Sequence, residues 1–318
     1  MAQFVEQTDK FMLKGRDFLD LADFSSEELR YLIDYAIELK RKLKAGETYH
    51  PLKGKSLGMI FEKSSTRTRV SFEVGMYQLG GQALFLSSND LQIGRGEIIA
   101  DTAQTLSRYV DGIMIRTFAH TKLLDLAQYA TIPVINALTD WSHPCQAMAD
   151  YQAVLEHKGH LEGLKIAFIG DGNNMAHSLM MGAAKFGMNF SIASPVGYWP
   201  DAEMITQSKQ VASVTGGSVV VTADPKEAIA DADIVYTDVW ASMGFEEEQK
   251  IREKAFAEYQ VDEGLVKYAK SDYLFLHCLP AHRGEEVSAG VIDGRNSIIF
   301  DEAENRLHAQ KAIMAAIM

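Results

Sequence analysis

Five residues that could hold an anion follow one another in FEKSSTRTRVSFEVG, residues 61–75. They are Ser65, Thr66, Arg67, Thr68 and Arg69. A helix that begins near Ser65 would offer unpaired backbone N–H groups and the positive end of its dipole. With three hydroxyl groups and the Arg67 guanidinium added, this arrangement suits a phosphate. The other interpretation is an ordinary Ser/Thr helix cap followed by surface arginines, of which Arg69 is expected to form a structural ion pair.

Two further segments place polar side chains where an apolar run ends. Arg116 closes the run DGIMIRT, and a buried arginine there needs an anionic partner, either a ligand or a structural carboxylate. In SHPCQ, residues 142–146, Pro144 suits a first helical position. His143 and Gln146 are three residues apart, so at a helix start they can hydrogen-bond a carbonyl oxygen and an amide NH₂ at one point. A histidine and a glutamine satisfied near a helix cap remain the alternative.

The sequence GDGNNMAHS, residues 170–178, matches a dinucleotide-binding turn only in part. Gly170 and Gly172 have the required spacing, but Met175 stands where the third glycine belongs. No acidic residue ends the next apolar run, FSIASP. We therefore expect neither a nicotinamide nor a flavin cofactor. Asn173 and Asn174 are instead polar groups at a helix start that could bind a polar ligand.

Asp238 and Cys278 each follow an apolar run in the second half of the chain. Asp238, in DVWASMG, could hold an ammonium group. Cys278, in HCLPAHRGEE, precedes a turn set by Pro280. The neighbouring His277 and His282 have a spacing that fits no common structural zinc site, and no second pair of ligands accompanies them. No nucleophile elbow surrounds the cysteine, so a cysteine hydrolase is not favoured, and an inert buried cysteine is the alternative.

The composition limits the partners of such a protein. The chain has 318 residues, a formal net charge of −12 and a pI of about 5.2. It lacks the basic surface that nucleic acid or an anionic membrane requires, so an anionic substrate must meet a local positive field. No run approaches the roughly 20 apolar residues of a membrane span, and the first residues lack the apolar core of a signal peptide. Two distant cysteines indicate no disulfide framework, and we expect a cytoplasmic protein.

Short apolar runs that alternate with amphipathic segments position these residues. The runs predict parallel strands over 56–61, 83–86, 112–117, 133–138, 164–170, 190–195, 218–223, 233–240 and 273–280, with SIIF as a further run at 297–300. A capping box at Ser25 and Glu28 predicts a helix before them, and a last helix is predicted from about Glu302. This alternation predicts an α/β fold in which parallel sheets are flanked by helices and ligands bind at the carboxyl ends of strands.

The length favours two domains with a boundary near residues 140–160. We expect one domain over residues 1–148, completed by a C-terminal helix at about 303–318 that packs back on it. The other domain is expected over residues 149–302. The charged segment MGFEEEQKIREKAF, which follows Ser242, is either a lid that closes on a ligand or a solvated helix.

Taken in order, STRTR, HPCQ, DGNN, DVWASMG and HCLP resemble the aspartate/ornithine carbamoyltransferase family, and within it the enzymes that act on ornithine. The resemblance covers nearly the whole chain. It implies that the carbamoyl group of carbamoyl phosphate is transferred to the side-chain amine of L-ornithine, giving citrulline and phosphate. It implies no cofactor, no metal and no covalent intermediate, because carbamoyl phosphate is already activated.

The resemblance also implies roles for individual residues. It assigns carbamoyl phosphate to Ser65, Thr66, Arg67, Thr68, Gln92, Arg116, His143, Gln146, Cys278, Leu279 and Arg306. It assigns ornithine to Asn174, Asp238, Ser242 and Met243. Catalytic roles are implied for Arg67, Arg116, His143 and Cys278. Gln92 matches a position that the family supplies from a neighbouring subunit, which implies a trimer or an assembly of trimers.

Other functions compete with this interpretation. Putrescine has neither an α-carboxylate nor an α-amine, so it would not use the DVWASMG segment, and that signature also disfavours aspartate as the acceptor. An N-acetylated ornithine stays open. Outside the family, a dehydrogenase is opposed by the missing third glycine. A non-catalytic phosphate-binding module would leave Asp238 and Cys278 without a purpose.

Overall fold

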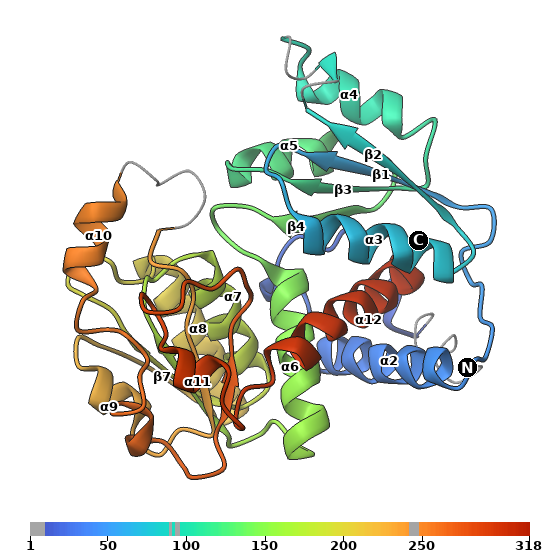
Figure 1. Ribbon diagram of the computed structural model, residues 1–318. Helices are drawn as coiled ribbons and strands as arrows, with labels where there is room; N and C mark the ends of the chain where they lie inside the picture. Colours follow the sequence, from blue (N-terminus) through green and yellow to red (C-terminus); the bar gives the residue numbers. More distant parts are fainter. Residues whose placement is uncertain (1–9, 89–90, 93–95, 242–247) are drawn as a thin grey trace. The chain divides into compact units, whose positions relative to one another are not determined.

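The computed structural model describes residues 10–88, 91–92, 96–241 and 248–318, and the chain forms two compact units (Figure 1). The first unit is Met1–Gln152 with Glu304–Met318, and the second is Ala153–Ala303. The division falls within α6 (Pro144–Lys158) and α12 (Ile299–Ile317). Among the residues described, no helix combines the length and apolar character that crossing a membrane requires.

A four-stranded parallel sheet in the order β2-β1-β3-β4 forms the centre of the first unit. Its strands are β1 (Ser56–Phe61), β2 (Gln82–Ser87), β3 (Gly112–Arg116) and β4 (Val134–Leu138). Three of them, β1, β3 and β4, are almost wholly buried, as their continuous apolar runs predict. β2 lies at the edge of the sheet and is half exposed.

Helices lie on both faces of this sheet (Figure 1). Helices that precede α6 in this unit include η1 (Leu21–Asp23), α2 (Ser26–Lys44), α3 (Thr66–Gln78), α4 (Ile99–Leu106) and α5 (His120–Tyr129). The predicted capping box at the start of α2 is present, because Ser25 Oγ accepts the Glu28 N–H and the Glu28 carboxylate accepts the Ser25 N–H. Ala103 of α4 and Leu123 of α5 pack with Ile60 and Ile113 in one apolar core.

The C-terminal helix packs on the first unit, as predicted. Gly75 of α3 permits the close approach, because a Cβ there would lie 3.1 Å from Met314 Cε and 3.3 Å from Lys311 Cγ. Helix α12 starts at Ile299, three residues before the predicted Glu302. Half of the apolar run SIIF, Ile299 and Phe300, is therefore helix, and Ser297 forms only an isolated bridge with Phe275.

The second unit contains a five-stranded parallel sheet in the order β7-β6-β5-β8-β9. Its strands are β5 (Lys165–Ile169), β6 (Asn189–Ala193), β7 (Ser218–Thr222), β8 (Ile234–Tyr236) and β9 (Leu274–Leu276). Its other elements are α7 (Asn174–Lys185), α8 (Ala202–Thr215), α9 (Pro225–Ile229), α10 (Gln249–Ala255), η4 (Val266–Tyr268) and α11 (Ala289–Ile292). The two sheets flanked by helices confirm the predicted fold class.

Strand β8 ends at Tyr236 and is shorter than the predicted 233–240, because side-chain hydrogen bonds replace backbone pairing after that residue. Thr237 Oγ1 donates a hydrogen bond to the Ile169 carbonyl at 2.6 Å, and the Asp238 carboxylate accepts the N–H of Val239 at 2.8 Å. These hydrogen bonds replace strand pairing after Tyr236. Because β5, β8 and β9 are neighbours, the turns that follow them lie at one edge of the sheet.

Candidate active site

The turn between β1 and α3 is a capped helix start, as predicted. Ser65 is extended, with φ −162° and ψ 115°, and its Oγ accepts the Thr68 N–H at 3.2 Å. Helix α3 then begins at Thr66, and no acidic residue lies in its first turn. The helix start therefore keeps its positive character. Thr66 is exposed, Arg67 is half-buried and Thr68 is buried. The hydrogen-bond donors of this helix start therefore extend from the surface into the interior.

Arg306 of α12 joins the β1–α3 turn to the start of α6. One of its terminal nitrogens donates to Gln146 Oε1 at 2.6 Å, and the other donates to Thr68 Oγ1 at 3.3 Å. Its Nε donates to Gln310 Oε1 at 3.0 Å, and Gln310 in turn donates to Ser71 Oγ on α3 at 2.8 Å. Three segments far apart in the sequence therefore meet at one buried guanidinium.

Arg116 and His143 are buried in the same unit, at the end of β3 and just before α6. Burial, together with three neighbouring guanidinium groups, holds the pKa of the His143 imidazole well below its ordinary value. Those groups belong to Arg306, Arg116 and Arg67. A neutral imidazole carries one N–H, which can donate to a carbonyl oxygen without adding a fourth positive charge. The local positive field that an anionic substrate needs is thus present in an acidic protein.

Arg69 is separate from this group, as the sequence predicts. Its Nε donates to Glu73 Oε1 at 3.1 Å, and its guanidinium lies over the Phe85 ring at 3.8 Å from the centroid. The i,i+4 ion pair runs along the exposed side of α3. Gln92 also lies outside the group and is exposed in the segment after β2, where its carbonyl accepts the Glu97 N–H at 3.1 Å.

The turn between β5 and α7 begins the second group of polar residues, in the second unit. Asn173 caps α7, because its Oδ1 accepts the N–H groups of Met175 and Ala176. Its Nδ2 donates to Asp238 Oδ2 at 2.9 Å. Asn174, the residue selected from the sequence, is the first residue of α7 and is partly exposed. No local pattern in the sequence indicated that Asn173 contacts Asp238, because the two residues are 65 positions apart.

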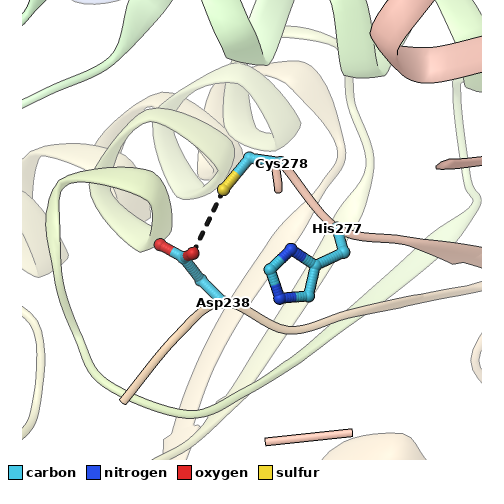
Figure 2. A group of neighbouring side chains, drawn as sticks. All are labelled: Asp238, His277 and Cys278. Atoms are coloured by element: carbon cyan, nitrogen blue, oxygen red, sulfur yellow. Dashed lines mark hydrogen bonds between the residues drawn. The ribbon is translucent and has the colours of Figure 1, made fainter. Parts of the chain in front are cut away.

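Asp238 is the centre of this second group. The Cys278 thiol points to its carboxylate and donates to Oδ1 at 3.1 Å (Figure 2). Asp238 is buried and Cys278 is half-buried. Because the thiol, the Asn173 amide and the Val239 N–H all donate to this carboxylate, its negative charge is stabilised, and it can bind an ammonium group.

A metal centre could be suspected where the potential ligand atoms of Asp238, His277 and Cys278 lie within 4.8 Å of one another (Figure 2). The hydrogen bonds of His277 argue against that. Its Nδ1 accepts the Leu279 N–H at 2.9 Å, so the ring proton is on Nε2, which lies 3.0 Å from Glu286 Oε1. Both ring nitrogens are engaged, and neither has a lone pair to offer a metal. The buried imidazole instead supports Leu279, whose φ is +59°.

The two glycines of GDGNN, residues 170–174, have a structural explanation that involves no dinucleotide. A Cβ on Gly172 would lie 2.1 Å from the backbone nitrogen of Pro200, so the chain segments cross too closely there for any side chain. Gly170 has φ +147°, a conformation that other residues rarely adopt. Both positions therefore require glycine for the path of the chain.

An ion pair fixes the residue between these glycines. Arg252 of α10 donates to Asp171 Oδ2 at 2.6 Å and to the Trp240 carbonyl at 3.0 Å. Burial raises the pKa of Asp171, although the Arg252 charge opposes this. The pair connects α10 with the DGNN turn and with the strand-end segment that contains Asp238. Ser242 and Met243, selected from the sequence, lie outside the described residues.

Comparisons with known proteins identify two matching family models. The carbamoyl-P binding domain of aspartate/ornithine carbamoyltransferase matches residues 16–156, and the Asp/Orn binding domain matches residues 162–317. The chain is 63% identical over 314 residues to an ornithine carbamoyltransferase of Anoxybacillus flavithermus, which covers 99% of this chain and 100% of that protein. It is 58% identical over 306 residues to that of Thermococcus kodakarensis, covering 96% of this chain and 97% of that one.

Solved structures agree with the sequence comparison. The ornithine carbamoyltransferase of Pyrococcus furiosus superposes with a TM-score of 0.94 at 55% identity, covering 96% of this chain and 98% of that one. The enzyme of Gloeobacter violaceus superposes with a TM-score of 0.86 at 48% identity, covering 96% and 99%.

Proposed function

The chain belongs to the aspartate/ornithine carbamoyltransferase family, and we propose that it transfers the carbamoyl group of carbamoyl phosphate to the side-chain amine of L-ornithine. The products are citrulline and phosphate. The observation that carries this proposal is the 63% identity over 314 residues to an ornithine carbamoyltransferase. The two domain matches, which together span nearly the whole chain, support it. The first unit would bind carbamoyl phosphate and the second would bind ornithine.

The β1–α3 turn is suited to the phosphate of the first substrate. Backbone N–H groups at a helix start, with hydroxyl groups and a guanidinium beside them, provide several donors to a dianion. The residues that we assign to this phosphate are Ser65, Thr66, Arg67, Thr68 and Arg116. When the carbamoyl–oxygen bond breaks, negative charge moves onto the departing phosphate. The same donors then stabilise the leaving group.

The carbamoyl group needs donors at its oxygen and acceptors at its NH₂. We assign the oxygen to Thr68, Arg116 and His143, whose donors would stabilise the oxyanion of a tetrahedral intermediate. We assign the NH₂ to the side-chain carbonyl of Gln146 and to the backbone carbonyl of Leu279. Arg306 supports this part of the site, because it already contacts Thr68 and Gln146.

Ornithine requires a different set of groups. We assign it to Asn174, Asp238, Ser242 and Met243, with Cys278 near the attacking amine. Asp238 supplies the negative charge that an ammonium group of the substrate needs. The attacking amine itself must be neutral, and its ordinary pKa is near 10.4, like that of lysine. The rate should therefore rise with pH as more of this amine loses its proton.

We propose further that the active protein is a trimer to which each subunit lends Gln92. An exposed apolar stripe on α3 supports this, since Val70, Val74 and Tyr77 are spaced to share one helix face and are 50%, 37% and 79% exposed. The edge strand β2, which leads to Gln92, is also exposed at Leu84 and Phe85.

Both cysteines are thiols, which fits a reducing cytoplasm.

A colorimetric assay for ureido products tests the proposal. The purified chain is given carbamoyl phosphate with L-ornithine, N-acetyl-L-ornithine, putrescine or L-aspartate in separate reactions. We expect kcat/KM for ornithine to exceed that for each other amine by at least about 100-fold. Putrescine lacks the α-carboxylate, N-acetyl-L-ornithine lacks the charged α-amine, and L-aspartate has a carboxylate in place of the side-chain amine. A preference for putrescine or the acetylated amine would replace the proposed substrate.

A further inference from the structure

We propose that Asp150 is a positioning residue that keeps the carbonyl of the Gln146 side chain turned toward the carbamoyl NH₂. This inference rests on the proposed function, because it concerns how the site recognises that NH₂ group. Asp150 lies one turn after Gln146 on α6, and both side chains are 1% exposed. Gln146 Nε2 donates to Asp150 Oδ1 at 2.8 Å.

The hydrogen bonds of Gln146 to Arg306 and Asp150 set the orientation of its amide. Arg306 has donors and no acceptor, so the atom 2.6 Å from its terminal nitrogen must be the Gln146 oxygen. The amide nitrogen therefore faces Asp150, whose carboxylate oxygen accepts its hydrogen bond. Rotating the amide by half a turn would set NH₂ against guanidinium and oxygen against carboxylate. Both contacts would be repulsive in a buried setting.

This orientation has a consequence for the substrate. A carbonyl oxygen has two lone pairs, and Arg306 uses one of those on Gln146 Oε1. The second can accept an N–H from the carbamoyl group. If the amide were reversed, its NH₂ would meet the substrate NH₂, and two donors would oppose each other. The hydrogen bond between Gln146 and Asp150 is thus what makes this position an acceptor.

Arg306 cannot secure the orientation alone during the reaction. It also donates to Thr68 Oγ1, and it belongs to the set that we assign to carbamoyl phosphate. When its guanidinium is drawn to the substrate, its bond to Gln146 must lengthen or be shared. Asp150 sits on the same helix as Gln146, so its contact does not depend on the substrate.

Two phosphonates that differ only at the NH₂ position test this inference. Phosphonoacetamide has the NH₂, and acetonylphosphonate has a methyl group in its place. Titration calorimetry gives the ratio of their dissociation constants for each variant. We expect the wild-type chain to bind phosphonoacetamide about tenfold more tightly, the worth of one to two hydrogen bonds. In Asp150→Asn, whose own amide can present either atom, the ratio should fall at least about threefold.

A reversed pair and a matched control make the test specific. Gln146→Glu alone puts two carboxylates in contact and should bind both phosphonates poorly. The double variant Gln146→Glu, Asp150→Asn restores a donor opposite an acceptor, so its ratio should return toward the wild-type value even if both affinities fall. Gln152→Met removes another buried hydrogen bond made by a side-chain amide of α6, from Gln152 Nε2 to Asn305 Oδ1 at 3.1 Å. This variant should leave the ratio unchanged.

The outcomes separate this inference from the proposed function. A wild-type ratio in Asp150→Asn would overturn the positioning role. Equal binding of the two phosphonates by the wild-type chain would remove the acceptor role of Gln146 and leave carbamoyl transfer standing. Binding of neither phosphonate by the wild-type chain would refute the proposed function itself. A lowered ratio in Gln152→Met would mean that general loosening of α6 explains the effect, which also contradicts the inference.

Discussion

The turns after β1 and β5 share a backbone arrangement and differ in electrostatic character. Each leads from a parallel strand into a helix whose N-cap side chain, Ser65 or Asn173, accepts backbone N–H groups. Both helix starts therefore present the positive end of a dipole. The first turn adds Arg67 and lies near two further arginines, whereas the second turns the Asn173 amide toward the carboxylate of Asp238.

This comparison shows that a capped helix start does not by itself choose its ligand. The same local fold faces a cluster of cations in the first unit and a hydrogen-bonded carboxylate in the second. The sign of the field is set by Arg67 within the first turn and by side chains brought in from other elements, Arg116 and Arg306 in the first unit and Asp238 in the second. We therefore expect substitutions in the two turns to affect different substrates.

The largest effect is expected from Arg67→Ala. Removing a principal electrostatic donor to the phosphate should lower kcat/KM for carbamoyl phosphate by about 10³-fold, measured by steady-state citrulline formation. Arg69→Ala is the matched control, because it removes the same side chain two residues later on the same helix, where it pairs with Glu73. Similar losses in both folded variants would contradict the assignment of the phosphate to this turn.

A smaller effect, on ornithine rather than on carbamoyl phosphate, is expected from Asp238→Asn. Losing a charged acceptor should raise KM for ornithine by about 10- to 100-fold and change KM for carbamoyl phosphate by less than about twofold. Asp272→Asn serves as the control, since this carboxylate is exposed and pairs with Lys158. If carbamoyl phosphate binding weakened more than ornithine binding, the assignment of the two substrates to the two units would have to be reversed.

The two N-caps give a direct comparison of the turns. Ser65→Ala and Asn173→Ala should each lower the free energy of unfolding by about 1 kcal/mol, which chemical denaturation can measure. Their kinetics should differ: the first should raise KM for carbamoyl phosphate, and the second should raise KM for ornithine about tenfold because Asp238 loses a donor. Identical kinetic changes would mean that the caps act only through stability.

The last effect concerns stability rather than turnover. It involves Lys311, a buried lysine of α12 that donates to Gln78 Oε1 of α3 at 2.9 Å. Burial lowers its pKa from 10.5 to about 8. Below pH 8 the folded chain carries a buried charge, so Lys311→Met should be more stable than the wild type at pH 7. Between about pH 8 and 10.5 the unfolded chain binds more protons than the folded one, so the wild type gains stability with rising pH and the difference shrinks.

Thermal unfolding at pH 7 and pH 10 measures this change. Lys209→Met, at an exposed position on α8, is the control for the removal of a lysine. A stability difference between Lys311→Met and the wild type that stays constant from pH 7 to pH 10 would argue against a depressed pKa for Lys311.

Local patterns in the sequence were enough for the strands, the caps and the residue types at the strand ends. Buried parallel strands appear as apolar runs, and the cap at Ser65 depends on residues three positions apart. Where the prediction failed, tertiary contacts intervened. Strand β8 ends early, where Thr237 Oγ1 donates to the Ile169 carbonyl, and α12 begins early, at the buried Ile299.

The sequence by itself determined which chemical groups this protein has and that they follow strands, because both depend on short-range periodicity. The tertiary structure alone decided which groups meet. Arg306 reaches Thr68 and Gln146 from positions 238 and 160 residues away, and Asn173 reaches Asp238 across 65 residues. A polar side chain can pair with many partners of suitable chemistry, and only the packing of helices on a sheet removes all but one of them.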